Sequence, residues 1–354
     1  MPSLQLERFG RMSSMRDAFT ARFAPGPALR TPPERNGSGL REAAVASLAM
    51  AVPEQVVGND VVAERAGVTA QWIMHRTGVR ERRHVRPGER LDALAAAAGR
   101  AALDEAGLDP ADLDLVLVAT LAADELTPNA APLVAHQLGA RRAGAMDVGA
   151  ACTGFLSALS LASAQVEGGR SEHVLVIGAD VVSRYVDKAD RGTAALFADG
   201  AGAVVVSPAN GGGGRIGEIV LRCDGRGAQA IRATDRERVI SMQGHDTFKA
   251  AVLRMSEATL EAAELSGLGL DDIDLYVYHQ ANARILKAVG EKLGLEDERV
   301  VNSIDRYGNT SSATLPIALA DARERGLLEP GMKVLLSAFG AGFTWGAGVI
   351  EWAA

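Results

Sequence analysis

The sequence has 354 residues, 47% of them hydrophobic and only 4% aromatic, so it can form two compact units or one large domain with a core of small aliphatic side chains. Its net charge of −7 argues against nucleic-acid binding, which normally requires a basic face that neutralises phosphates. No apolar run approaches the roughly 18 to 20 residues that cross a bilayer, so we expect no membrane partner.

The first 40 residues contain six arginines among Ser, Pro and Gly, and we interpret them as a disordered tail without a catalytic role. A transit peptide has a similar composition, but Glu7, Asp17 and Glu34 weaken that alternative. Met12 or Met15 is then a candidate for the true start of the chain.

From residue 41 onward, short apolar runs alternate with Ala-rich helical patterns, which is typical of an α/β architecture with strands buried on both faces. Strands are expected at 115–119, 174–178, 203–206, 275–278 and 334–338. The pattern of residues 107–115 recurs at residues 267–275, a constant offset of 160 (267 minus 107). The sequence therefore predicts a duplicated α/β unit, with halves at 41–210 and 211–354 and a hinge near 207–215.

The similarity between the halves extends to one turn in each. Residues 147–152 are interpreted as a strand and turn that lead into a helix over 155–166, and residues 304–309 as their counterpart before a helix over 311–325. On this alignment Cys152 and Asn309 occupy matching turns. The glycines at 211–214 are interpreted as a linker, because no Lys-Ser or Lys-Thr follows them as in a phosphate-binding loop.

Cys152 is one of two cysteines, and no signal peptide precedes either of them, so we expect free thiols in a reducing cytoplasm. It lies in a Gly-rich turn where a strand gives way to a helix. Unpaired N–H groups at the start of a helix lower a thiol pKa, so the position favours a nucleophilic thiolate. A buried structural cysteine is the alternative for Cys152, and for Cys223 we expect no catalytic role.

Two further polar residues follow the same logic. His279 comes directly after a buried strand, where α/β folds place ligands, although one histidine there can be purely structural. No second His or Cys stands at metal-ligand spacing, so a metal is not expected. Asn309 by itself is a good helix cap. Together, however, a nucleophilic thiol with a His and an amide donor forms a coherent set for stabilising an oxyanion.

These segments, with their spacing, closely resemble the β-ketoacyl-acyl carrier protein synthase III family from about Arg41 to the end of the chain. The motifs that carry the resemblance are Ala-Ala-Cys-Thr-Gly-Phe at 150–155, His-Gln-Ala-Asn at 279–282, Tyr-Gly-Asn-Thr-Ser at 307–311 and Phe-Gly-Ala-Gly-Phe-Thr-Trp-Gly at 339–346. Shorter matches lie at 72–78, 190–193, 199–203 and 244–249. The resemblance implies a thiolase-like fold with two halves stacked as α-β-α-β-α layers, and a homodimer.

The resemblance also implies the activity and its residues. An acyl-CoA starter is transferred to Cys152 and condensed with malonyl-acyl carrier protein, with loss of CO₂, to start fatty acid or polyketide synthesis without a metal or redox cofactor. The backbone N–H groups of Cys152 and Ala341 form an oxyanion hole, while His279 and Asn309 stabilise the enolate. Coenzyme A is assigned to Trp72, Arg76, Arg191, Phe248 and Asn282, carrier-protein docking to Lys249 and Arg284, and the acyl pocket to Thr127 and Phe197.

Two positions depart from the family pattern. His245 stands where Asn is common beside the pantetheine arm, which leaves the preferred acyl carrier open. Thr127 occupies a position where acetyl-selective members often have Phe, a side chain that reaches across the dimer. The smaller residue predicts room for longer or branched starters.

Three other functions are alternatives to this interpretation. An acyltransferase of the same fold, which moves the acyl group to an alcohol or amine, stays open on sequence alone, although retention of His279 and Asn309 favours decarboxylation. A catalytically silent carrier-binding subunit would be expected to lack Cys152. A Rossmann dehydrogenase lacks support, because no G-x-G-x-x-G follows the first strand.

Overall fold

The computed structural model describes residues 41–209, 214–234 and 237–353. The predicted tail at 1–40 and most of the predicted glycine linker therefore lie outside the described residues. The strands are β1 Ala43–Ala51, β2 Val56–Gly58, β3 Glu81–Arg83, β4 Leu115–Ala119, β5 Gly144–Val148, β6 Val174–Val181, β7 Asp199–Pro208, β8 Ile216–Cys223, β9 Ile231–Arg232, β10 Ser241–Met242, β11 Leu275–Tyr278, β12 Lys333–Gly340 and β13 Thr344–Glu351.

The helices are α2 Asn59–Ala66, α3 Ala70–Thr77, α4 Leu91–Ala106, α5 Ala130–Leu138, α6 Gly154–Glu167, α7 Gly244–Leu265, α8 Ala283–Leu293, α9 Ile304–Tyr307 and α10 Thr314–Glu324. All five expected strands are present, as β4, β6, β7, β11 and β12. Within the described ranges, no helix combines the length and apolar character needed to cross a bilayer.

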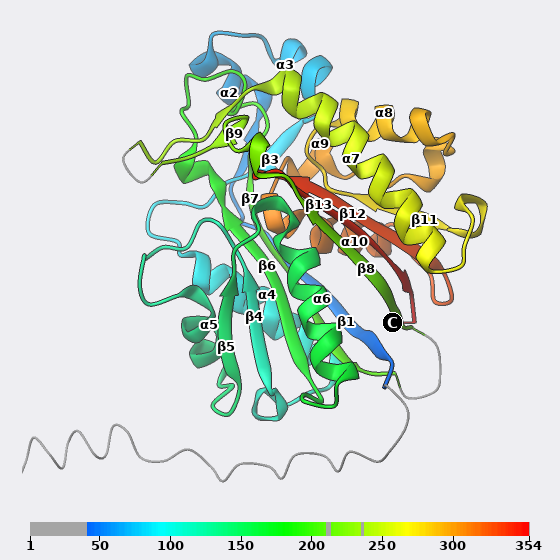
Figure 1. The fold of residues 1–354 in the computed structure, drawn as a ribbon. Coiled ribbons are helices and arrows are strands. Elements are labelled where there is room, and N and C mark those ends of the chain that lie inside the picture. The colour runs from blue at the N-terminus through cyan, green and yellow to red at the C-terminus, as the bar shows by residue number, and fades with distance from the viewer. Residues whose placement is uncertain (1–40, 210–213, 235–236, 354) are drawn as a thin grey trace, which may run out of the picture. The chain divides into compact units, whose positions relative to one another are not determined.

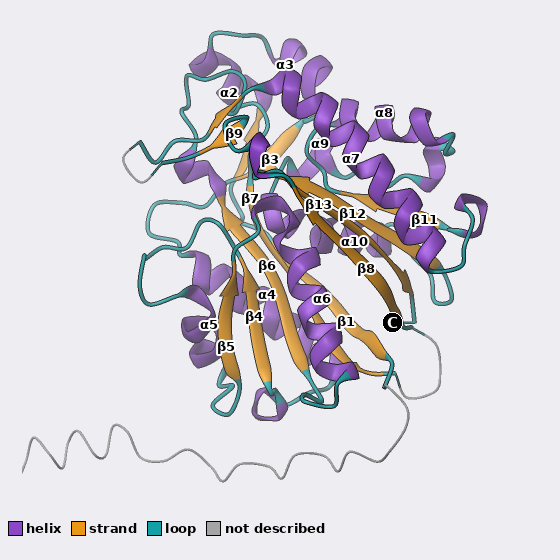
Figure 2. Ribbon diagram, viewed as in Figure 1, coloured by secondary structure: helices purple, strands orange, loops and turns teal. Residues whose placement is uncertain are grey.

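Two mixed sheets dominate the structure (Figures 1 and 2). The first has the strand order β1-β7-β6-β4-β5, and the second has the order β8-β13-β12-β11. Each sheet contains an equivalent pair of parallel neighbouring strands: in β4 and β6 of the first sheet Leu115 pairs with Val174, and in β11 and β12 of the second sheet Leu275 pairs with Val334. The two residues of the second pair each lie 160 positions after their counterparts in the first pair (275 minus 115 and 334 minus 174). The repeat in the sequence therefore corresponds to the same strand pairing in both sheets.

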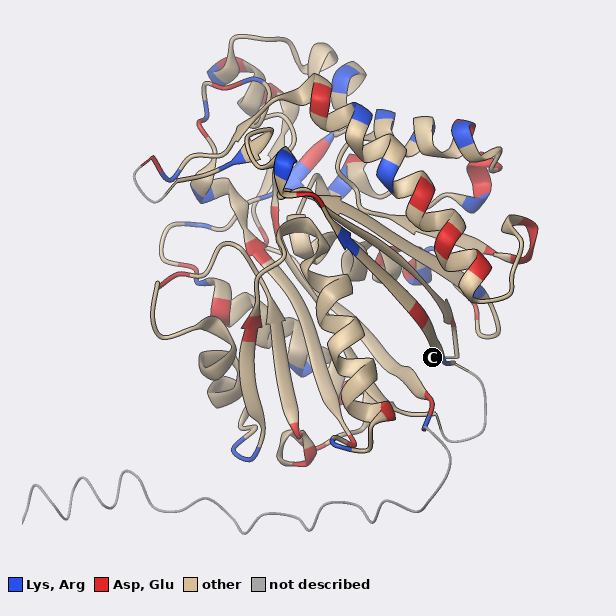
Figure 3. Ribbon diagram, viewed as in Figure 1, with Lys and Arg blue, Asp and Glu red and all other residues tan. Residues whose placement is uncertain are grey.

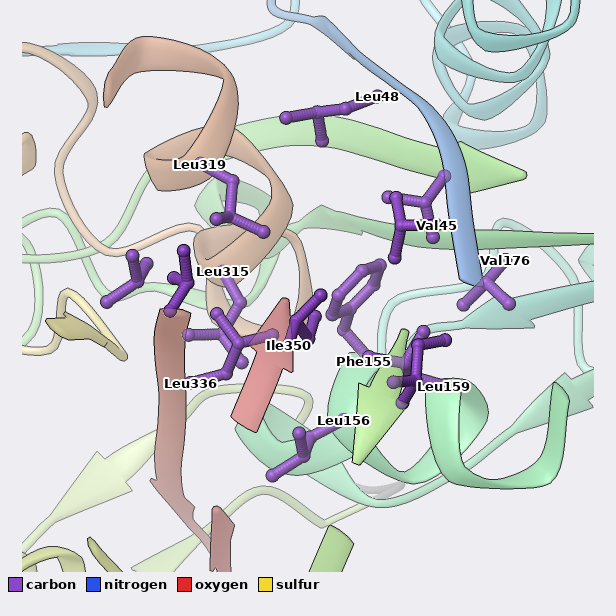
Figure 4. Close-up of a cluster of buried hydrophobic side chains, with 14 of the residues drawn as sticks. Val45, Leu48, Phe155, Leu156, Leu159, Val176, Leu315, Leu319, Leu336 and Ile350 are labelled. Atoms are coloured by element: carbon purple, nitrogen blue, oxygen red, sulfur yellow. The ribbon is translucent and has the colours of Figure 1, made fainter. Parts of the chain in front are cut away.

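The sheets are arranged as five layers of helix and strand. Side chains of α4 and α5 pack on the outer face of the first sheet, and those of α7 and α8 pack on the outer face of the second. Helices α6 and α10 lie between the sheets, and their leucines meet side chains from both (Figure 4). Each fully buried Leu or Phe there contributes ~1.5–3 kcal/mol through removal of apolar surface from water. The thiolase-like layering expected from the sequence is therefore confirmed.

The two halves share this central core. The division of the chain at 41–210 and 211–354 therefore stays a prediction of where one repeat ends and the next begins; the first strand after it, β8, begins at Ile216.

The predicted pairing of turns, however, is wrong. Residues 304–307 form the short helix α9 and no strand, and the counterpart of Cys152 at the offset of 160 is Ser312 (312 minus 152). Both turns are short 3₁₀ turns, Ala151–Thr153 and Ser311–Ala313, and each leads directly into a central helix.

Candidate active site

Cys152 lies in the middle of the 3₁₀ turn before α6, half-buried between the two halves of the fold. The turn begins with Ala151 in the left-handed region at φ 46°. Thr153 fixes the turn against the second half, because its hydroxyl donates to the Ala150 carbonyl at 2.7 Å and lies 2.9 Å from the Thr344 hydroxyl. The Cys152 sulfur lies 3.6 Å from the Ser311 hydroxyl.

The expectation that this position lowers the thiol pKa is wrong. Burial raises the pKa of Cys152 to about 11, and the nearby carboxylate of Asp180 acts in the same direction. The Ser311 hydroxyl opposes both effects. Desolvation disfavours the charged thiolate by more than the start of the helix favours it, so the resting side chain is a thiol.

His279 directly follows β11, and its backbone N–H donates to the Ser337 carbonyl on β12 at 2.8 Å. Burial lowers the pKa of its imidazole to about 3, so the ring is neutral at physiological pH. Within the described part of the chain, Nδ1 of this ring is buried without a hydrogen-bond partner. A neutral imidazole offers one N–H donor without adding a full charge to the cavity.

Asn309 is held at both ends of its backbone by the segment that precedes β7. Its N–H donates to the Leu196 carbonyl at 2.9 Å, and its carbonyl accepts from Ala198 N–H at 2.9 Å. The side-chain Oδ1 accepts from Ser311 N–H at 2.9 Å, which is the local turn role considered for this residue. Since Oδ1 is occupied, Nδ2 is left as the group that can donate to a ligand.

The backbone beside Cys152 comes from the end of β12. A Cβ atom placed on Gly340 would lie 2.9 Å from the Cys152 backbone nitrogen, so only glycine allows this approach. Ala341 follows Gly340 immediately and is partly exposed. Its N–H therefore belongs to the loop that adjoins the Cys152 turn, and its assignment to an oxyanion hole stays a prediction.

A cavity of about 680 Å³ joins these residues to the surface. Its lining includes the three residues proposed for catalysis, Cys152, His279 and Asn309. It also includes all five residues assigned to coenzyme A, which are Trp72, Arg76, Arg191, Phe248 and Asn282. Both residues assigned to carrier-protein docking, Lys249 and Arg284, line it as well, as do the acyl-pocket residue Phe197 and the unusual His245. Residues from six separate parts of the sequence thus meet at one opening.

The aromatic and basic side chains at this opening already stack on one another. The guanidinium groups of Arg191 and Arg76 lie 5.7 and 5.8 Å from the centre of the Trp72 ring, and that of Arg284 lies 5.7 Å from the centre of Phe248. An adenine between Trp72 and Arg191 therefore requires Arg191 to move. Asn282 is already used, because Oδ1 caps α8 through Arg284 N–H and Nδ2 donates to the Arg76 carbonyl at 3.2 Å.

The predicted acyl-pocket residue Thr127 differs from the others in its location. It is exposed and is absent from the lining of the cavity described here, and its neighbour Leu126 is 98% exposed. A contribution of Thr127 to a pocket would therefore have to be made to a partner subunit, and it stays a prediction.

Sequence reasoning missed the possible importance of Ser311, Ser312 and Asp180, which lie near the turn that contains Cys152. Applying the offset of 160 to Cys152 identifies Ser312, and that signal was present in the sequence. Asp180 carries no local signature, because its partners come from two distant segments, the end of β4 and the turn Ser311–Ala313. Among the described residues, no group of three or more His, Cys, Asp or Glu side chains is placed to hold a metal ion.

Two stacked copies of one α/β unit, with a cysteine, a histidine and an asparagine brought to a single cavity, define a thiolase-fold condensing enzyme. Residues 146–225 match the family model for 3-oxoacyl-[acyl-carrier-protein] synthase III, and residues 263–352 match the model for the C-terminal part of the same enzymes. A β-ketoacyl-[acyl-carrier-protein] synthase III of Streptomyces coelicolor is 43% identical over 315 residues, which are 89% of this chain and 95% of that protein.

Solved structures agree. The 3-oxoacyl-[acyl-carrier-protein] synthase III of Aquifex aeolicus has a TM-score of 0.85 at 37% identity and covers 88% of this chain and 100% of its own. A priming β-ketosynthase of a polyketide biosynthetic pathway has a TM-score of 0.85 at 36% identity and covers 92% of this chain and 99% of its own. The chain therefore belongs to the β-ketoacyl-acyl carrier protein synthase III family.

Proposed function

We propose that this enzyme condenses an acyl-CoA starter with malonyl-acyl carrier protein and releases CO₂, as the first step of a fatty acid or polyketide chain. The observation that carries the proposal is the single cavity of about 680 Å³ that holds Cys152, His279 and Asn309 together with the residues assigned to coenzyme A. As a transferase, the enzyme forms an acyl-Cys152 thioester first and uses it as the electrophile in a carbon–carbon bond-forming step.

In the first half-reaction the Cys152 sulfur attacks the thioester carbonyl, and coenzyme A leaves with the thiol proton. The carbonyl oxygen becomes negative in the tetrahedral intermediate. The backbone N–H groups of Cys152 and Ala341 are the donors proposed for that oxygen, and the close approach at Gly340 supports this arrangement.

In the second half-reaction malonyl-acyl carrier protein loses CO₂, and the enolate that remains attacks the acyl-Cys152 carbonyl. The C–S bond to Cys152 then breaks, and the released thiolate takes up a proton from solvent to restore the thiol. The neutral imidazole of His279 and Nδ2 of Asn309 are the donors proposed for the enolate oxygen. Burial keeps His279 neutral, with a pKa of about 3, which supports a donor role that does not change between pH 5 and 8. No metal or redox cofactor is required for this chemistry.

The carrier protein is expected to dock at the basic mouth of the cavity. Lys249 and Arg284 are both exposed there, and along α7 Asp246 is followed by Lys249 and Arg254 in the first half of the helix, while Glu257, Glu261 and Glu264 lie in its second half (Figure 3). An acidic carrier would therefore be attracted to the start of α7 rather than to its end. Lys249→Glu and Arg284→Glu should raise the KM for the carrier, more at low salt than at high salt, and leave self-acylation by acyl-CoA nearly unchanged.

We further infer a homodimer. Strand β5 is the last strand of the first sheet, and Met146 on it is 49% exposed, which an edge strand of a stable sheet normally avoids. A second copy paired along β5 would cover this edge and bring Thr127 near a neighbouring active site. A cytoplasmic location is consistent with two free cysteines and with coenzyme A and carrier-protein substrates.

The test of the proposed function is a mixture of purified enzyme, acyl-CoA and malonyl-acyl carrier protein. We expect release of CO₂ together with a 3-oxoacyl-carrier product, both dependent on acyl-CoA. Transfer of the acyl group to a small alcohol or amine without CO₂ release would contradict the proposal and favour the acyltransferase alternative.

A further inference from the structure

The Cys152 thiol has one side-chain hydrogen-bond partner among the described residues, the Ser311 hydroxyl at 3.6 Å. We propose that Ser311 is a further catalytic residue, whose hydroxyl donates a hydrogen bond to the Cys152 sulfur and stabilises its thiolate while the starter is taken from coenzyme A. The inference rests on the proposed function, because it assigns a role within the self-acylation step.

The orientation of the Ser311 hydroxyl is built into the fold. Ser311 adopts φ 53°, a left-handed conformation that a residue with a side chain rarely adopts, and it is only 1% exposed. Such a conformation costs roughly 1–3 kcal/mol and persists only when surrounding contacts impose it. Its N–H is fixed by the hydrogen bond to Asn309 Oδ1 at 2.9 Å. The same turn thus orients both a catalytic amide and the hydroxyl beside the nucleophile.

Asp180 at the end of β6 holds the other side of the turn. Its Oδ2 accepts from Ser312 N–H at 2.9 Å and from the Ser312 hydroxyl at 2.6 Å. Its Oδ1 accepts from the Thr120 hydroxyl at 3.0 Å and from Leu121 N–H at 2.8 Å. Asp180 is completely buried, so this carboxylate is a fixed anchor between the two halves. Asp180 and Ser312 are therefore positioning residues for Ser311.

Such a donor at 3.6 Å from the sulfur fits the chemistry of the step. Cys152 rests as a thiol with a pKa of about 11, and His279 is neutral with a pKa of about 3, so a thiolate–imidazolium pair does not form. As acylation proceeds, negative charge appears on sulfur, and a hydrogen bond to a charged acceptor is stronger than one to a thiol. Ser311 keeps its own hydrogen throughout. The thiol proton ends on coenzyme A, the C–S bond to coenzyme A breaks, and the C–S bond to Cys152 forms.

The experiment compares Ser311→Ala and Ser311→Gly in a Cys223→Ala background, where Cys152 is the one remaining thiol. Iodoacetamide alkylation is followed from pH 6 to 11, and acylation by acyl-CoA is followed by intact mass. Both variants should be alkylated about tenfold more slowly below the apparent pKa, and acylated about 10- to 100-fold more slowly at neutral pH. The other titratable groups near the thiol are Asp180 on β6, whose pKa is raised by burial, and His279 after β11, which stays neutral across this pH range.

The two variants separate chemistry from folding. Gly accepts the left-handed conformation without strain, so Ser311→Gly should fold even where Ser311→Ala does not. A preformed acyl-enzyme of either variant should release CO₂ from malonyl-acyl carrier protein at nearly the rate of the enzyme that retains Ser311, because a thioester sulfur carries little charge. If a folded variant keeps the original alkylation profile and acylation rate, the role of Ser311 is refuted. If the unmodified enzyme accepts no acyl-CoA, the proposed function fails while the alkylation profile still tests Ser311.

Discussion

The turn that carries Cys152 and the turn that carries Ser312 hold equivalent places in the two halves, yet their surroundings differ. Each turn touches the end of a central strand of the other half: Cys152 touches Gly340, and Ser312 touches Asp180. These partners are also 160 residues apart (340 minus 180). Glycine leaves room for backbone N–H groups and for the thiol to reach the cavity, whereas aspartate locks its turn in place.

The comparison indicates that the two copies of the duplicated unit have different roles at the same position. Cys152 is partly buried and lines the cavity, while the Ser312 side chain is 1% exposed and hydrogen-bonded to a buried carboxylate. One copy of the turn therefore carries the proposed nucleophile, and the other copy forms a rigid support beside Asn309 and Ser311. The predictions that follow test this division, from the largest expected effect to the smallest.

Loss of a donor on the second half should impair only the second half-reaction. His279→Ala and Asn309→Ala are each expected to slow CO₂ release from malonyl-acyl carrier protein on the order of 10²- to 10³-fold, because each removes one donor to the enolate oxygen. Both proteins should still gain one acyl group on Cys152 when mixed with acyl-CoA. Stopped reactions analysed for CO₂ and for acyl-enzyme mass measure the two steps separately, and normal decarboxylation with failed self-acylation would reverse the assigned roles.

Ser312→Ala should cost stability, whereas Cys152→Ala should cost activity. Removing the Ser312 hydroxyl takes a hydrogen bond from the buried carboxylate of Asp180, which is worth about 1.5–3 kcal/mol of unfolding free energy. Chemical denaturation followed by fluorescence measures the change.

Cys152→Ala provides the matched control at the equivalent position, with a smaller loss of stability and no acyl adduct. Ser312→Ala should still form the adduct, although more slowly because Ser311 is less well held. Equal losses of unfolding free energy for the two variants would contradict the proposal that the Cys152 turn serves catalysis and the Ser312 turn serves stability.

The choice of starter should depend on Thr127 across the proposed dimer. Thr127→Phe is expected to shift preference toward acetyl-CoA, with up to ~0.8 kcal/mol lost for each excluded methylene of a longer chain. Values of kcat/KM for acetyl, butyryl, isobutyryl and octanoyl thioesters give the ranking. Leu126→Phe is the control, because Leu126 lies beside Thr127 and is nearly fully exposed. An unchanged ranking in Thr127→Phe would remove this residue from the pocket.

The sequence predicted the parts of the fold that depend on local pattern. Short apolar runs gave β4, β6, β7, β11 and β12. The Gly-rich turn at Cys152, the strand end at His279 and the Tyr-Gly-Asn-Thr-Ser segment at Asn309 gave three residues that line the cavity. These signals lie within single segments, so periodicity and flanking residues reveal them without knowledge of packing.

The sequence could not predict features that depend on contacts between the halves. The alignment of Cys152 with Asn309 failed because the second half has the helix α9 where a strand was expected, and because Val300 pairs with Tyr276 only as an isolated bridge. The raised pKa of Cys152 follows from burial between the halves, which no local motif encodes. The role of Asp180 likewise arises only when Ser312 is brought beside it.

The central claim is that Cys152 alone carries the acyl group, and intact-protein mass spectrometry after incubation with a panel of acyl-CoAs tests it most directly. The unmodified enzyme and Cys223→Ala should each gain the mass of one acyl group, because Cys223 is exposed and outside the cavity. Cys152→Ala, and Cys152→Ala combined with Ser312→Cys, should gain none, because a thiol at position 312 would be buried beside Asp180. An acyl adduct on Cys152→Ala would contradict the account.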